Sequence, residues 1–167
     1  MVTPSVKPSV ERPKTLTTRI DSRSAKNIAT LHPVVQEVAI RHLEACLDDG
    51  IPAKIISGTR TYQQQDELYH KRPRVTKARG GYSNHNFGLA YDIGIFRGGK
   101  YLEESPDYAE AGAIGKKLGL EWGGDWKSFV DEPHFQLRPT WAKGMTEGTM
   151  LAQLRRRVSD ERDLFVV

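Results

Sequence analysis

Two histidines of this 167-residue sequence, His85 and His134, are each predicted to lie where a loop meets a strand, with a carboxylate nearby. Asp92 follows His85, and Asp131 precedes His134. A catalytic zinc site takes three protein ligands from His, Asp and Glu and leaves its fourth position for water. His85, Asp92 and His134 would supply such a set.

The spacing of the first two residues requires a bend in the backbone. Residues seven apart on a straight strand face opposite sides, so His85 and Asp92 can reach one ion only if the chain turns between them. Gly88 is a suitable place for that turn. Asp92 would then start the strand DIGIF and point into a cleft, while Ile93 and Ile95 face the core.

The stretch DEPHFQL, residues 131–137, brings a second carboxylate close to a histidine. Pro133 is incompatible with a helix interior and is expected to turn Asp131 back toward the side chain of His134. A carboxylate near the metal that does not bind it could take a proton from the bound water. Asp131 is the candidate for this general base, with Glu132 as the alternative. From spacing alone, ordinary loop residues remain a competing interpretation, because His, Asp and Gly are common in loops.

The other histidines and the single cysteine have simpler explanations. His32 precedes Pro33 at a helix start, while His42 and His70 lie on helices beside basic residues, so all three are expected at surface or interfacial positions. Cys46 lies in an apolar helical pattern, which favours a small buried residue over a nucleophile. One cysteine also excludes an internal disulfide and a Cys-rich zinc module.

The first half of the chain shows the elements that must position these residues. Apolar residues at helical spacing predict one helix over about 27–48, which Gly50 ends. PAKIISGTR predicts a short strand, and TYQQQDELYHK predicts a helix that Pro73 terminates. Residues 73–88 are polar and contain glycine, which is typical of a loop.

The second half contributes the remaining strands. LAYDIGIFRGGKYL predicts two strands joined by a tight turn at the GG dipeptide, 98–99. PDYAEAGAIGKKLGL predicts a helix with Pro106 in its first turn and Gly119 near its end, and a final strand is expected over 134–137. This order favours an α+β fold with a small antiparallel sheet flanked by helices.

Charge and terminal composition describe the rest of the chain. The net charge of +4 and the pI near 9.2 favour anionic partners. Residues 1–20 are rich in Pro, Thr, Ser and charge, which predicts a flexible arm.

Residues 146–167 are expected to form a basic helix and tail, whose RRR run could contact an anionic envelope surface or form a solvated helix face. No interleaved basic and aromatic pattern is present, so nucleic-acid binding is not expected.

Two separated motifs resemble a known family. SNHNFGLAYD, residues 83–92, together with DEPH, residues 131–134, looks like the paired zinc signature of the LAS peptidases. This family includes D-alanyl-D-alanine carboxypeptidases and dipeptidases and phage L-alanyl-D-glutamate endopeptidases. The likeness extends to SGTRTYQQQDELY and LGLEWGGDW. It covers roughly residues 24–140 and makes 21–145 the expected catalytic domain.

The resemblance implies a LAS/hedgehog-like zinc peptidase fold and a role for each matching residue. Asp131 would be the general base, and Arg60 matches an arginine thought to polarise the scissile carbonyl and stabilise its oxyanion. Ser83 and Gln65 match positions that line the substrate cleft. One zinc ion would have three ligands: His85, Asp92 and His134.

The resemblance also implies a reaction. Asp131 stands where D-alanyl-D-alanine enzymes commonly carry Glu, and WGGDW and PHFQ are more similar to the L-alanyl-D-glutamate endopeptidase branch. We therefore expect a monomer that cleaves the L-alanyl-D-glutamate bond of the peptidoglycan stem peptide. The alternatives are a D-alanyl-D-alanine carboxypeptidase or dipeptidase in wall remodelling, and a non-catalytic, zinc-stabilised wall-binding module.

The terminal sequences suggest how such an enzyme would reach its substrate. The N-terminus has no apolar run of the length that a secretory signal needs, and no stretch approaches a membrane span. The chain is also small and shows no obvious second wall-binding domain. We therefore expect a phage endolysin that is made in the host cytoplasm and reaches the cell wall after a holin opens the membrane.

Overall fold

The computed structural model describes residues 19–167, so the predicted arm, residues 1–20, lies almost entirely outside the described residues. The helices within 19–167 are α1 (Ser22–Ala29), α2 (Pro33–Asp48), α3 (Tyr62–His70), α4 (Asp107–Lys117) and α5 (Glu147–Ser159). The strands are β1 (Ala53–Ser57), β2 (Ala90–Arg97), β3 (Lys100–Leu102), β4 (Glu121–Trp122) and β5 (His134–Gln136), and the 3-10 turns are η1 (Asn84–Phe87), η2 (Gly123–Asp125) and η3 (Thr140–Ala142). None of these helices is long and apolar enough to cross a bilayer.

All five strands belong to one antiparallel sheet, which confirms the predicted α+β class. Their order is β1-β2-β5-β4, and β3 pairs with the far part of β2. The central strand β2 places Asp92 opposite His134 of β5 on one side and opposite Ser57 of β1 on the other. Strand pairing therefore brings together residues that are far apart in the sequence.

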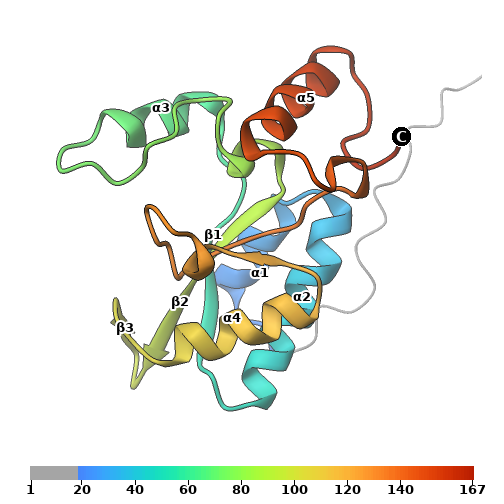
Figure 1. Ribbon diagram of the computed structural model, residues 1–167. Helices are drawn as coiled ribbons and strands as arrows, with labels where there is room; N and C mark the ends of the chain where they lie inside the picture. The colour runs from blue at the N-terminus through green and yellow to red at the C-terminus, as the bar shows by residue number, and fades with distance from the viewer. Residues whose placement is uncertain (1–18) are drawn as a thin grey trace, which may run out of the picture.

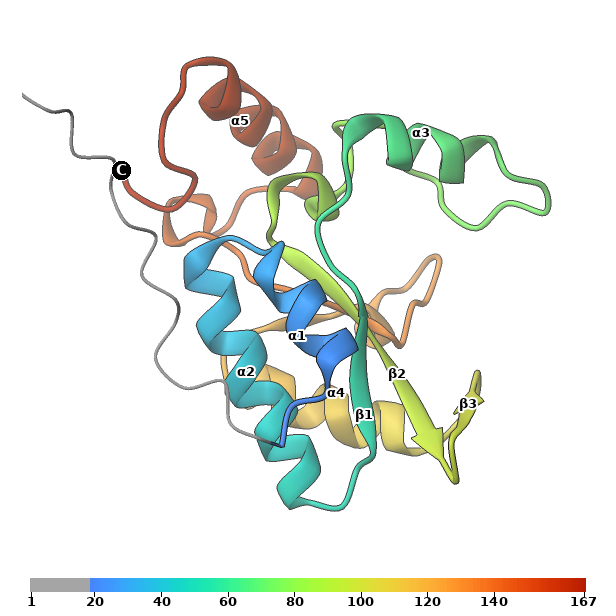
Figure 2. The same cartoon turned by 180° about the vertical axis from the view of Figure 1, so that it is seen from behind.

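Alternation along the strands separates the hydrophobic core from the opposite face of the sheet. Figures 1 and 2 show α1, α2 and α4 around the strands, with α3 and α5 at the end of the sheet away from β3. Asp92 lies between core residues of β2, so its side chain faces the other way. The large core residues contributed by β2 and β5 are Tyr91, Ile93, Ile95 and Phe135.

The predicted single helix over 27–48 is wrong, because the structure has two helices, α1 and α2, in this region. The ring of Pro33 prevents a preceding helix from continuing through it and biases His32 toward an extended conformation. His32 accordingly has φ −58° and ψ 141°, and its Nδ1 accepts a hydrogen bond from the first turn of α2. Asp21 caps α1, so this helix begins earlier than predicted.

Other predicted elements are confirmed. α3 begins with a capping box, in which the Thr61 hydroxyl accepts from the Gln64 amide and the Gln64 side chain accepts from the Thr61 amide. The β2–β3 turn places Gly98 and Gly99 at φ 57° and 75°, a region that glycine reaches without steric cost. Local sequence signals therefore specify both features.

The prediction that His42 lies at a surface or interfacial position is wrong. His42 lies in the core, where it is only 1% exposed. Its Nδ1 lies 2.8 Å from the Tyr91 hydroxyl and its Nε2 lies 2.9 Å from the Ala111 carbonyl oxygen. Burial lowers the pKa of His42 to about 4, so the ring is neutral. Cys46 is buried as predicted, and burial raises the pKa of its thiol to about 12.

The C-terminal helix α5 packs against the rest of the domain. Its apolar side forms a second core cluster with Phe87 and Leu89. Arg157 is buried over the ring of Trp141, 4.4 Å from its centroid, while Arg156 is exposed. α5 is thus an integral part of the fold. The buried residues on its apolar side are Met150, Leu151 and Leu154.

Candidate metal centre

Two histidine rings and a carboxylate converge on the face of the sheet opposite the core. His85 Nε2 lies 3.3 Å from Asp92 Oδ1, and His134 Nδ1 lies 3.4 Å from the same oxygen. The three candidate ligand atoms all lie within 4.8 Å of one another. A tetrahedral zinc site with bonds of about 2.0–2.2 Å separates its ligand atoms by roughly 3.3–3.6 Å. The donor set therefore suits a zinc ion, and both nitrogen–oxygen distances fall within this range.

The predicted bend between His85 and Asp92 is present. His85 lies in η1, where the Ser83 hydroxyl accepts from the His85 amide. Gly88 follows with φ 70°, and a Cβ there would lie 2.7 Å from the His32 amide nitrogen, so a larger residue would clash. The chain then enters β2 at Ala90, two residues earlier than the predicted start of this strand.

Hydrogen bonds behind both rings leave the ligand nitrogens free. His85 Nδ1 lies 2.9 Å from the carbonyl oxygen of Gly58, which can only accept, so the ring proton is on Nδ1 and Nε2 carries the lone pair. His134 Nε2 lies 2.8 Å from Gln136 Oε1, which can only accept, so in the neutral ring Nδ1 carries the lone pair. Metal-ligating histidines in proteins are oriented by bonds of this kind.

Arg60 binds the second oxygen of Asp92. Its Nη2 lies 2.8 Å from Asp92 Oδ2 and 3.0 Å from Ser57 Oγ. Burial opposes ionisation of Asp92, but the charges and hydrogen bonds of His85 and His134 outweigh it, and the pKa of Asp92 is held well below its usual range. Asp92 is therefore a carboxylate at neutral pH, as a metal ligand must be.

Asp131 lies in the same cavity wall as the three candidate ligands. The predicted turn is present, since the His134 amide donates to the Asp131 carbonyl oxygen at 3.1 Å. Burial, followed by the charge of Asp92, raises the pKa of Asp131, which makes the carboxylate a better proton acceptor. Glu132 is exposed and does not line the cavity, so the geometry favours Asp131 over this alternative.

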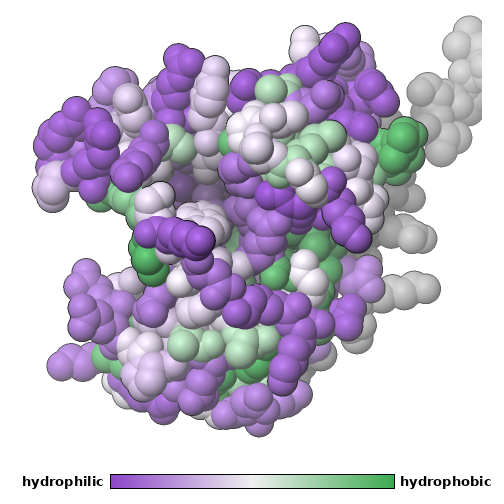
Figure 3. Space-filling model, viewed as in Figure 1, coloured by the Kyte–Doolittle hydropathy of each residue, from purple (hydrophilic) through white to green (hydrophobic). Residues whose placement is uncertain are grey.

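A cavity of about 730 Å³ opens over the candidate metal site. One side is formed by the loop after α3 and the other by the segment 126–133. Trp126 packs on His134 with ring centroids 4.8 Å apart, and the Lys77 ammonium lies 5.4 Å from the ring centroid of Phe129. Figure 3 shows the surface hollowed below the segment that carries α3. Cavities of this size accommodate small ligands or part of a peptide.

The two residues predicted to contact substrate differ in position. Ser83 lines the cavity. Gln65 is 0% exposed, its Oε1 accepts from Arg60 Nη1 at 3.4 Å, and its Nε2 donates to the Ala78 carbonyl oxygen at 2.9 Å. The structure places Gln65 behind Arg60 rather than in the cavity wall, so its side chain is in a position to support Arg60.

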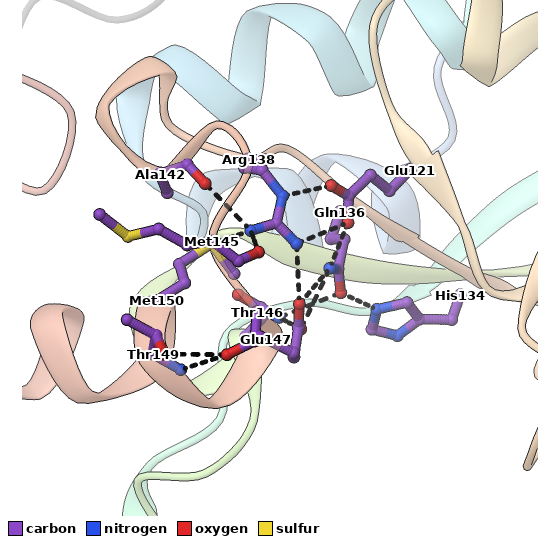
Figure 4. A network of polar contacts seen from close by, with 11 residues as sticks. Glu121, His134, Gln136, Arg138, Ala142, Met145, Thr146, Glu147, Thr149 and Met150 are labelled. Carbon is purple, nitrogen blue, oxygen red and sulfur yellow. Dashed lines mark hydrogen bonds and ion pairs between the residues drawn. The ribbon is translucent and has the colours of Figure 1, made fainter.

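Sequence reasoning misses a polar cluster beside His134. Figure 4 shows the His134 ring directed toward Gln136, which lies among the side chains of Glu121, Arg138 and Glu147. The spacing of His134 and Gln136, two apart on a strand, places both on one face and is a signal that could have identified Gln136. No local spacing connects Glu147 of α5 to this site.

Comparisons with known proteins agree with this geometry. A family model described as D-alanyl-D-alanine carboxypeptidase matches residues 76–137, which contain the three candidate ligands and Asp131. The chain is 40% identical over 124 residues to the peptidoglycan L-alanyl-D-glutamate endopeptidase CwlK of Bacillus subtilis, covering 65% of this chain and 74% of that protein. It is 33% identical over 119 residues to the L-alanyl-D-glutamate peptidase of Listeria phage A118, covering 69% of this chain and 41% of the phage protein.

A solved structure extends the likeness from the sequence to the fold. The L-Ala D-Glu endopeptidase ChiX of Serratia marcescens has a TM-score of 0.59 and 29% sequence identity to this chain. The superposition covers 70% of this chain and 87% of ChiX. The likeness to ChiX is therefore one of fold as well as of sequence.

The antiparallel sheet, its His–Asp–His cluster and the matching relatives define a metallopeptidase. The chain belongs to the LAS-type peptidases, the family that its paired motifs resemble. Family, fold and enzyme class are thereby confirmed. The individual roles of Arg60, Ser83, Gln65, Asp131 and the three candidate ligands stay predictions.

Proposed function

We propose that this chain is a zinc-dependent peptidoglycan hydrolase that cleaves the L-alanyl-D-glutamate bond of the stem peptide. The observation that carries the proposal is the placement of Asp131 in one cavity wall with His85, Asp92 and His134. The choice of bond is supported by the names of the Bacillus and Listeria phage relatives, both L-alanyl-D-glutamate peptidases.

The chain's own residues supply a complete set of roles for amide hydrolysis. When bound by His85, Asp92 and His134, zinc supplies Lewis acidity and lowers the pKa of a water molecule. Asp131 accepts the proton of the attacking water and passes it to the leaving amine. Arg60 lines the cavity as a fixed cation, suited to the negative charge that develops on the scissile carbonyl oxygen. Since these residues come from one chain, a monomer suffices.

A second candidate uses the same site on a different bond. The description of the matching family model favours D-alanyl-D-alanine carboxypeptidase or dipeptidase activity. Both candidates would share the ligands and the general base, so the arrangement of the metal centre does not separate them. The released product does.

Mass spectrometry of digested peptidoglycan tests the proposal. Endopeptidase action exposes new glutamate amino groups and releases no free D-alanine, whereas the second candidate releases D-alanine. A chelator should abolish cleavage, and added zinc should restore it. If the zinc-loaded chain leaves peptidoglycan uncut but still binds it, the proposal fails and a wall-binding module with a structural metal takes its place.

We further propose that the enzyme is a phage endolysin, made in the host cytoplasm and released to the wall by a holin. The likeness to the Listeria phage peptidase supports this proposal. Peptidoglycan would be its main partner, and exposed basic residues such as Arg156 could add contact with an anionic envelope surface. Expression in a Gram-negative cell should cause lysis only when a holin is co-expressed. Lysis without the holin would contradict the proposed route.

A further inference from the structure

Gln136 lies directly behind the candidate ligand His134, and its amide is hydrogen-bonded at both ends. Gln136 Oε1 lies 2.8 Å from His134 Nε2 and accepts from Asn84 Nδ2 at 3.1 Å. Gln136 Nε2 donates to Glu121 Oε2 at 2.9 Å and to Glu147 Oε1 at 3.2 Å. The side chain is therefore enclosed by the Asn84 amide nitrogen and the His134 ring on its oxygen side and by two carboxylates on its nitrogen side.

These partners determine the orientation of the amide. Rotation by 180° would turn the Gln136 oxygen toward Glu121 and Glu147, which only accept when ionised, and would turn the NH₂ group toward the NH₂ group of Asn84. Buried groups left without partners cost about 1–3 kcal/mol each. Gln136 must therefore present its oxygen to His134. An acceptor at this position keeps the ring proton on Nε2 and leaves Nδ1 free for the metal.

Arg138 in turn holds the two carboxylates together. Its Nε lies 2.5 Å from Glu121 Oε1, and its Nη2 lies 3.1 Å from Glu147 Oε2. Its Nη1 donates to the carbonyl oxygens of Ala142 and Met145, which anchors the guanidinium to the segment before α5 (Figure 4). The cluster thereby joins β4, β5 and α5 behind one metal-facing ring.

The orientation of Asn84 supports the same arrangement. Its Nδ2 donates to Gln136 Oε1 and to the Glu147 carboxylate. Within residues 19–167, Asn84 Oδ1 is a buried side-chain oxygen that has no hydrogen-bond partner. The two contacts made by the nitrogen therefore offset the cost of an unpaired acceptor. One reaches Gln136 itself, and the other reaches Glu147, which orients Gln136.

We propose that Gln136 is a positioning residue, oriented by Glu121 and Glu147, that sets the tautomer of His134 and thereby the zinc affinity of the site. Through Glu147, α5 becomes part of the metal centre. This inference rests on the proposed function only in taking His134 as a zinc ligand. A purely structural role for Gln136 would instead affect stability and leave zinc affinity and the tautomer unchanged.

Gln136→Met tests the proposal, because methionine keeps the length of the side chain but removes both hydrogen-bonding ends. Loss of such a partner should weaken zinc binding by about 10–100-fold, measured by competition with a chelator. In the zinc-free protein at alkaline pH, ¹H–¹⁵N spectra should show that His134 loses its preference for a proton on Nε2. Gln153→Met, the same change on an exposed position of α5, is the matched control and should alter neither readout.

Glu147→Ala provides a second variant in case Gln136→Met fails to fold. The Glu147 side chain is 44% exposed, so its truncation leaves no large internal cavity. It should weaken zinc binding and loosen the His134 tautomer in the same direction. Folded variants that bind zinc as tightly as the unaltered chain, with the tautomer unchanged, would overturn the proposal. Neither measurement needs a substrate, so failure of the proposed cleavage reaction would be recognised separately.

Discussion

Arg60 Nη2 and Asp92 Oδ2 lie 2.8 Å apart, in an ion pair whose side chains are only 22% and 15% exposed. The pair occupies one oxygen of the carboxylate and leaves Oδ1 facing both histidines. Arg60 also lines the cavity. The same guanidinium therefore orients a candidate ligand and presents positive charge to the space where a substrate would bind.

Replacing this arginine should separate its two effects. Arg60→Ala should weaken zinc binding, because an outer partner of a metal ligand typically contributes about 10–100-fold to affinity. We expect turnover to stay lower by roughly 10²–10³-fold even at saturating zinc, because the charge that we propose to face the scissile carbonyl is also lost. Steady-state kinetics over a zinc titration measure both effects. Full recovery of turnover at high zinc would show that Arg60 acts through Asp92 alone.

The general base can be tested by a pair of adjacent substitutions. Asp131→Asn removes the proton acceptor and should lower turnover by about 10²–10⁴-fold while zinc remains bound. Glu132→Gln is the matched control, because Glu132 is exposed and lies outside the cavity wall. Turnover and zinc content should be measured on the same preparations. An active Asp131→Asn variant, or an inactive Glu132→Gln variant, would exclude the assignment of Asp131.

The parts of the site that the sequence predicts are those built from short-range geometry. The bend at Gly88 and the turn from Asp131 to His134 follow from residue types within a few positions, and both are present. The pairing of Asp92 with His134 depends on the register of β2 and β5, which no local pattern specifies. The family resemblance, rather than spacing, joins these two halves.

The features that sequence reasoning misses depend on tertiary packing. His42 shares its helix with polar and charged residues, so its neighbours in the sequence do not indicate burial. Its ring is buried because α2 packs against α4, and there it contacts the Tyr91 hydroxyl and the Ala111 carbonyl oxygen. The placement of Glu147 near Gln136 likewise requires the position of α5. Long-range contacts of this kind leave no periodic signal in the sequence.

The packing of α5 predicts that it contributes to stability. Leu154 is fully buried in the second core cluster, so Leu154→Ala should lower the free energy of unfolding by about 2–5 kcal/mol. Arg156→Ala, on the exposed side of the same helix with a side chain that is 79% exposed, should change it by about 0.5 kcal/mol or less. Urea denaturation of the two variants provides the measurement. An unchanged stability for Leu154→Ala would mean that α5 is a detachable tail.

Burial of His42 predicts a pH dependence of stability that a single substitution can isolate. Its pKa is about 4 in the folded chain and 6.5 ordinarily, so the unfolded chain takes up a proton first as the pH falls. The neutral His42 ring therefore makes its full contribution to the free energy of unfolding above pH 6.5. This contribution is lost as the pH falls toward about 4. The shift corresponds to about 3 kcal/mol.

Urea unfolding of the zinc-free chain over this pH interval tests the expected loss. His42→Gln lacks the titrating ring, so its stability deficit relative to the unaltered chain should shrink by about 3 kcal/mol as the pH falls. All other ionisable groups are common to the two proteins, so their contributions cancel in the difference. His70→Gln, the same change at an exposed position, is the matched control. A constant difference for His42→Gln would mean that the buried ring accepts a proton without loss of stability, which its contacts with Tyr91 and Ala111 argue against.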